Sequence, residues 1–181
     1  MSSSRIFAAA ASAVLLLCAC TSTTITPMEG NASSKSYSTI AIGEITAKDS
    51  LWNSDTEVVR RALIKKLNET KAFAQVVDPA PTPLQDNAVL LTGEITDFDK
   101  GDKALRAIIG FGAGAATMTG VFKIRDSSGA VLTSFQTEKG YSGGAGIGGF
   151  DLVDMDDLAG KLGEETADVV VRWSKGQKLK P

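Results

Sequence analysis

The sequence predicts a single α+β domain, in which a mixed or antiparallel sheet of about five strands is packed by two main helices, one of them at the C-terminus. Several short runs are rich in apolar and β-branched residues and are bounded by turn signals, as strands are. Two longer segments instead repeat apolar residues at helical spacing. A chain of 181 residues is long enough to form one domain with an adequate core.

The first 19 residues have the order of an export signal. The segment Met1 to Arg5 carries one positive charge, and Ile6 to Leu17 is almost entirely apolar. From Ile6 to Ala19 there are 14 residues, whereas about 20 apolar residues are needed to span a bilayer core. The pattern therefore predicts a cleaved signal peptide over residues 1–19 rather than a permanent transmembrane helix.

Cys20 ends the segment Leu17-Cys18-Ala19-Cys20, which resembles the bacterial lipobox. The resemblance implies that Cys20 receives diacylglycerol, that the signal is cut before it, and that its new amino group is then acylated, with palmitate among the acyl groups. Several acyl chains would hold the protein stably on a membrane. Thr21 follows the cysteine in place of Asp, and the resemblance to lipoproteins then implies sorting to the outer membrane. The alternative is a secreted protein with an incidental cysteine.

The segment after Cys20 is rich in Ser, Thr, Gly and Asn and has few large apolar residues. Such a composition does not offset the entropy lost on ordering. We therefore expect residues 20–35 to be the acylated cysteine and a flexible tether, and residues 36–181 to be the α+β domain.

Within the domain, a helix is predicted to begin at a capping box, Ser54-Asp55-Thr56-Glu57, and a second helix is predicted over 154–173. A turn at 126–129 joins two strands as a hairpin. The predicted strands are 37–46, 74–78, 89–98, 117–125 and 131–141.

Glycine is concentrated in the second half of the chain, because 12 of the 18 glycines lie between Gly101 and Gly149. The backbone there needs close approaches or positive φ angles. Around one cluster we expect a contact surface, in which small residues admit a partner backbone, an arginine donates bidentate hydrogen bonds and an aromatic ring acts as an anchor. The alternative is that these residues only pack the fold. The candidate residues are Arg106, Gly110, Phe111, Gly112 and Gly114.

The same run carries a family resemblance. Leu105-Arg106-Ala107-Ile108-Ile109-Gly110-Phe111-Gly112-Ala113-Gly114, preceded by Gly93-Glu-Ile-Thr-Asp-Phe and followed by Lys-Ile-Arg-Asp-Ser-Ser-Gly129-Ala-Val-Leu, resembles the bacterial lipoprotein family catalogued as domain of unknown function 4410. The resemblance covers roughly residues 36 to 175. It implies an α+β domain on a lipidated tether, and it brings no activity, ligand or catalytic residue.

The residue types argue against an enzyme and against nucleic acid binding. The chain has no histidine, and both cysteines lie in the signal and anchor region, so common general bases and thiol nucleophiles are missing. Removing the signal leaves a weakly acidic chain, which has no electrostatic footprint for nucleic acid. The basic cluster Arg60, Arg61, Lys65 and Lys66 is interpreted as a solvated helix face. No cofactor is expected.

Carboxylates keep one enzyme alternative open, a divalent-cation-dependent enzyme. Asp97 and Asp99, or Asp154, Asp156 and Asp157, offer oxygen ligands, but neither set has the spacing of a calcium loop. Acidic caps and turns are the commoner use of such residues, so we expect no metal site.

These observations favour a noncatalytic outer-membrane lipoprotein. Its domain would lie in the periplasm, with exposure at the cell surface left open, and would bind an envelope protein or a cell-wall component. The alternative is a self-assembling or membrane-inserting subunit of a secretion-type envelope complex, with the apolar, glycine-rich segment 107–121 as the inserting part. The sequence leaves the identity of the partner and the oligomeric state open.

Overall fold

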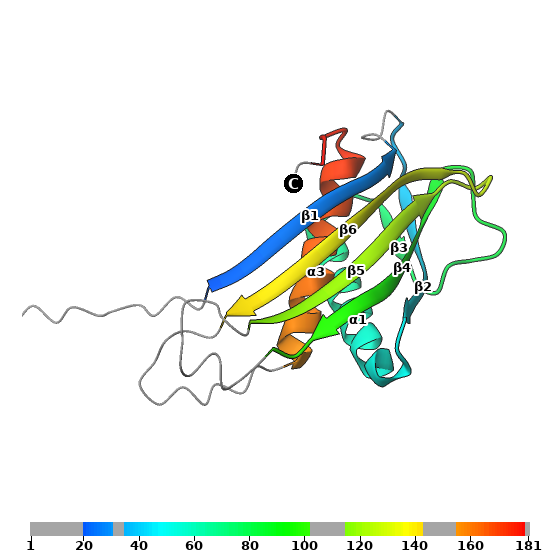
Figure 1. Cartoon of the computed structure of the whole chain (residues 1–181). Coiled ribbons are helices and arrows are strands. Elements are labelled where there is room, and N and C mark those ends of the chain that lie inside the picture. The colour runs from blue at the N-terminus through cyan, green and yellow to red at the C-terminus, as the bar shows by residue number, and fades with distance from the viewer. Residues whose placement is uncertain (1–19, 31–34, 102–114, 143–154, 180–181) are drawn as a thin grey trace, which may run out of the picture.

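The computed structural model describes residues 20–30, 35–101, 115–142 and 155–179 (Figure 1). Its elements, in chain order, are β1 (Cys20–Gly30), β2 (Thr39–Ala47), the 3₁₀ turn η1 (Ser50–Trp52), α1 (Asn53–Thr70), β3 (Gln75–Val77), β4 (Ala88–Asp99), β5 (Ala116–Arg125), β6 (Val131–Ser142) and α3 (Met155–Ser174).

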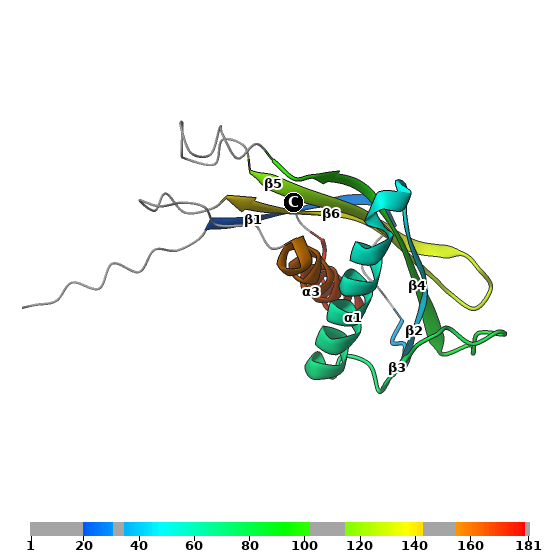
Figure 2. The ribbon, with the colours of Figure 1, turned by 90° about the horizontal axis from the view of Figure 1, so that it is seen from below.

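The strands form one mixed sheet in the order β1-β6-β5-β4-β2-β3. Strand β2 runs parallel to β3 and β4, and the other neighbours are antiparallel. Both helices lie on the same face of this sheet (Figure 2). The predicted α+β class is confirmed, with six strands among the described residues instead of about five. The additional strand is β1.

The flexible tether predicted for residues 20–35 is wrong for residues 20–30. This segment is strand β1, which pairs antiparallel with β6 from Cys20 opposite Ser142 to Gly30 opposite Thr133. Threonine and isoleucine fit a pleated, half-buried surface well, and the distant strand β6 supplies the hydrogen-bonding partner that composition alone does not reveal. The folded domain therefore extends to residues before Ser36, the start that the sequence predicts.

Side chains on the inner face of β1 make apolar and polar contacts with the rest of the domain. Ile25 is buried in the core. Lys139 of β6 donates a hydrogen bond to the Thr23 hydroxyl, and its Nζ lies 3.8 Å from Glu165 Oε2 on α3. Arg172 approaches the other oxygen of Glu165 at 3.6 Å. This half-buried polar cluster joins an edge strand, a central strand and the C-terminal helix.

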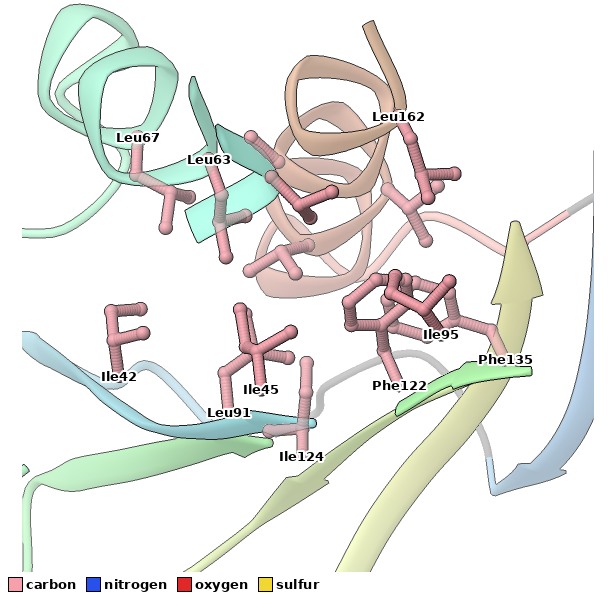
Figure 3. Packing of buried hydrophobic residues seen from close by; sticks show 14 of the residues in the cluster. Ile42, Ile45, Leu63, Leu67, Leu91, Ile95, Phe122, Ile124, Phe135 and Leu162 are labelled. Carbon is pink, nitrogen blue, oxygen red and sulfur yellow. The ribbon is translucent and has the colours of Figure 1, made fainter. Parts of the chain in front are cut away.

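The core lies between the sheet and the two helices, where side chains from both layers meet (Figure 3). The labelled members are Ile42, Ile45, Leu63, Leu67, Leu91, Ile95, Phe122, Ile124, Phe135 and Leu162.

Phe122 explains two of the glycines in the strands. A Cβ atom at Gly93 would lie 2.5 Å from Phe122 Cδ1, and one at Gly120 would lie 2.8 Å from Phe122 Cε2. The ring therefore occupies the space above two glycines, and it stacks on Phe135 with ring centroids 5.8 Å apart. These two glycines serve packing and not a site.

The start of α1 differs from the predicted capping box. The helix begins at Asn53, Trp52 occupies the N-cap position without a side-chain hydrogen bond, and the Thr56 hydroxyl donates to the Asn53 carbonyl. The Asp49 carboxylate instead accepts from the Leu51 N–H at 2.9 Å and caps η1. The side-chain cap therefore lies at the start of η1, and the N-cap of α1 is Trp52 and not Ser54 as predicted.

The basic cluster on α1 is largely paired. Arg60 forms an ion pair with Asp78 and donates to the Gly43 carbonyl at 2.7 Å. Lys66 lies 3.8 Å from Asp168 on α3. Arg60 and Lys66 thus connect α1 to neighbouring elements through partly buried contacts, whereas Lys65 pairs with Glu69 on the same helix and Arg61 is exposed, as predicted for a solvated helix face.

The position of β1 predicts that a chain starting at Ser36 is less stable than one starting at Thr21. Loss of β1 exposes the pairing edge of β6 and removes Ile25, whose burial alone contributes about 2 kcal/mol. Urea denaturation of the two proteins measures the difference in the free energy of unfolding. Equal stabilities would mean that β1 is not part of the cooperative unit.

Candidate functional site

Four strands bring their ends together at the end of the sheet where Cys20 lies. Cys20 is opposite Ser142, the last residue of β6, and Asp99 at the end of β4 is opposite Thr117 near the start of β5. Tyr141 of β6 pairs with Ala116, the first residue of β5. We call this region the Cys20 end of the sheet.

The predicted contact residues Arg106, Gly110, Phe111, Gly112 and Gly114 lie outside the described residues. Their segment connects β4 to β5, and the strand ends that flank it lie at the Cys20 end. The predicted contact at these residues stays a prediction.

Only part of the predicted membrane-inserting segment 107–121 is described. Residues 116–121 belong to β5, which is hydrogen-bonded on both sides, to β4 and to β6. Within the described residues, no helix has the length and apolar character needed to cross a membrane.

The turn η1 carries an apolar pair that sequence analysis did not single out. Leu51 is 81% exposed, while Trp52 is partly buried and makes an edge contact with Phe98 of β4, with ring centroids 6.1 Å apart. The Nζ atom of Lys100 lies 6.0 Å from the centroid of the Phe98 ring. The contact with Phe98 places η1 beside the last residues of β4, at the Cys20 end.

Asp55 is a buried carboxyl group in the first turn of α1. Its pKa is raised above the usual aspartate value, mainly by burial and further by the negative charge of Asp156, while Lys100 partly opposes the shift. The sequence pattern predicts Asp55 only as part of the capping box. Its proximity to α3, which raises its pKa, has no local signal in the sequence.

The carboxylates of the metal-dependent alternative have different surroundings. Asp99 accepts a hydrogen bond from the Gly101 N–H at 2.8 Å, and Asp157 pairs with Lys161 one turn later on α3. Asp97 and Asp156 are exposed, and Asp154 lies outside the described residues. In the part of the chain that the structure describes, no three metal-ligating side chains gather.

The profile of one protein family, described as Domain of unknown function (DUF4410), matches residues 26–145. No curated protein matches the chain. Among solved structures, it is similar to the PelC dodecamer from Paraburkholderia phytofirmans, with 14% identity and a TM-score of 0.56 over 87% of this chain and 100% of that chain. A single-residue variant of the same PelC dodecamer gives 14% identity and a TM-score of 0.52 with the same coverage.

A minor lipoprotein from Acinetobacter baumannii matches 80% of this chain and 98% of its own, with 15% identity and a TM-score of 0.42. The PelC similarity shows a shared fold.

The raised pKa of Asp55 predicts how stability depends on pH. Because the folded state holds this proton more tightly than the unfolded state, whose pKa is about 3.9, the contribution of Asp55 to stability falls as the pH rises from that value through the folded pKa. Asp55→Asn removes this pH-dependent fall in stability, because asparagine has no carboxyl group to ionise. The stability of Asp55→Asn relative to the native protein should therefore rise with pH across the same window and then level off.

Denaturation midpoints between about pH 4 and pH 7 measure this difference. Asp156→Asn is the matched control, because it removes the repulsion between the Asp55 and Asp156 carboxylates but leaves Asp55 buried. It should narrow the pH range over which the stability contribution of Asp55 changes. A constant difference between Asp55→Asn and the native protein at every pH would contradict the assignment.

Proposed function

The chain belongs to the DUF4410 family, and from this premise we propose that it is a noncatalytic lipoprotein of the bacterial cell envelope. In this proposal acyl groups on Cys20 hold it on the outer membrane, and its domain binds another component of the envelope. In this proposal the chain is a binding module held at the membrane. Its function is to bind a partner and not to catalyse a reaction.

One observation carries the proposal: the cysteine of the lipobox-like segment is also the first residue of strand β1. Each buried methylene of an acyl chain contributes about 0.8 kcal/mol, so several chains anchor a protein stably. With no linker between the modified residue and the sheet, acylation fixes the Cys20 end next to the bilayer. The segment that contains Arg106 and Phe111 starts and ends at this same end.

The residue types support a binding role. The sequence has no histidine, and its two cysteines are Cys18 and Cys20. In the proposed contact, Phe111 acts as the anchor, Arg106 donates to a carboxylate or phosphate of the partner, and the adjacent glycines allow close approach.

Self-assembly is a second candidate, favoured by the similarity of the fold to a PelC dodecamer. Because Cys20 lies at one end of the domain, all copies must present that end to the same bilayer. This requirement is met by cyclic symmetry, in which each copy contacts its neighbour head to tail, and not by a twofold arrangement that points anchors in opposite directions. Insertion of 107–121 into the membrane would have to remove part of β5 from the middle of the sheet.

The anchor predicts the chemical state and location of the mature protein. Mass spectrometry should find an N-terminal Cys20 carrying acyl groups, in the outer-membrane fraction. A chain with an ordinary cleavable signal followed directly by Thr21 should instead be recovered in the soluble periplasmic fraction. A free thiol at Cys20, or unchanged membrane recovery of the chain that begins at Thr21, would remove the basis of the proposal.

The contact residues predict a separation of binding from stability. Arg106→Ala and Phe111→Ala should leave the melting temperature nearly unchanged and abolish co-purification of envelope components, because a central anchor contributes about 2 kcal/mol or more to binding. Gly112→Val, which adds a β-branched side chain, should damage folding. If all three variants lose stability alike, the segment is scaffold. Crosslinking of the purified protein into rings without other components would favour self-assembly.

A further inference from the structure

We propose that η1 is a second membrane contact, in which Leu51 and Trp52 enter the interface of the zwitterionic bilayer that holds the acyl groups of Cys20. This inference deepens the proposed function and rests on the acylation of Cys20. A second contact at η1 would fix the orientation of the domain on the lipid surface, which the anchor alone does not do.

The register of the sheet places η1 near the anchor. Trp52 contacts Phe98, which is opposite Met118 on β5. Met118 is opposite Lys139, and Lys139 is opposite Thr23 on β1. Thr23 is three residues from Cys20, about 10 Å along the strand, and β1 and β4 are about 14 Å apart across the sheet. Phe98, the strand residue that Trp52 contacts, therefore lies at the same end of the sheet as Cys20, displaced from it by about 10 Å along the strands and about 14 Å across them.

Leu51 has the most exposed large apolar side chain among the described residues, at 81%. The other two exposed ones, Met28 and Val131, lie toward the opposite end of the sheet, where β1 ends and β6 begins. Single exposed apolar residues are common on soluble proteins, so exposure alone would decide nothing. What distinguishes Leu51 is its place at the end from which an acyl anchor would extend.

The geometry of η1 suits insertion into an interface. The Asp49 side chain holds the Leu51 N–H, and the Trp52 N–H donates to the Asp49 carbonyl at 3.0 Å, so the turn presents Leu51 from a defined backbone. The Trp52 ring is packed on Phe98. Tryptophan with nearby lysines is typical of the level of the lipid headgroups, because the indole is both apolar and a hydrogen-bond donor. Lys48 and Lys100 are exposed beside this turn.

The charges around η1 indicate the kind of lipid surface. Lys48 and Lys100 are balanced by Asp49 and Asp99, all four of which are exposed. At the start of α3, the exposed side chains of Asp156 and Asp157 add negative charge at the same end. A surface without net positive charge gains nothing from anionic lipid. The contact therefore depends on apolar burial and favours zwitterionic headgroups.

Trp52 is itself the reporter for a test. The chain has one other tryptophan, Trp173, which is 1% exposed and gives a constant background. The acylated protein is reconstituted into phosphatidylcholine vesicles whose acyl chains are brominated near the headgroup. Bromine should quench Trp52, and iodide in the water should quench it less than in the protein without vesicles.

Leu51→Asp is the decisive variant, because a charge at this exposed position leaves the core intact and opposes insertion. It should lose the greater part of the bromine quenching, with an unchanged melting temperature. Met28→Asp, at the opposite end, is the matched control and should keep the quenching. Vesicles with added anionic lipid should give less quenching. Equal quenching in Leu51→Asp and the native protein, or full access of iodide to Trp52 on vesicles, would overturn the inference.

The same samples separate this inference from the proposed function. If the acylated protein remains on the vesicles while Trp52 stays open to iodide, the anchor holds and the second contact is wrong. If Trp52 becomes protected only after addition of an envelope extract, η1 contacts a protein and the lipid assignment is wrong. If Cys20 carries no acyl groups in the cell, the proposed function fails first, and the inference fails with it.

Discussion

The antiparallel pairing of β1 with β6 is the constraint on which the functional geometry depends. It runs from Cys20 opposite Ser142 to Gly30 opposite Thr133, so the residue that would carry the lipid is part of the sheet. A flexible tether lets a domain take any orientation over a membrane. A strand that begins at the modified residue instead connects the anchor rigidly to the domain. The distance of the domain's side chains from the bilayer is then restricted.

Polar contacts as well as apolar burial hold β1 in its register. Ile25 is buried in the core, the Thr23 hydroxyl accepts a hydrogen bond from Lys139, and Lys139 also faces Glu165 on α3. Removing one partner of a buried ion pair costs about 3 to 5 kcal/mol, and less where the pair is partly exposed, as here. A slip of β1 by one residue would reverse its two faces, taking Ile25 out of the core and Thr23 away from Lys139.

The elements that the sequence predicted well are those with local signals. The hairpin of β5 and β6 has alternating residues and the turn 126–129, where Gly129 has a φ of +85° and Asp126 accepts from the Ser128 and Ala130 N–H groups. The C-terminal helix has a continuous apolar stripe. Strand β1 was missed because its Ser- and Thr-rich composition resembles a linker, and its partner lies more than a hundred residues away.

The candidate site was predictable only in part for the same physical reason. Cys20 has a local motif, whereas the exposure of Leu51 and the pKa of Asp55 arise from the packing of η1 and α1 against β4 and α3, which no local pattern encodes. Two contacts with a bilayer, at Cys20 and at η1, would restrict the tilt of the domain. Since both helices cover one face of the sheet, the other face would then stand at a fixed angle to the membrane, the same in every copy (Figure 2). A head-to-tail assembly of such copies needs no further device to keep its anchors in one plane.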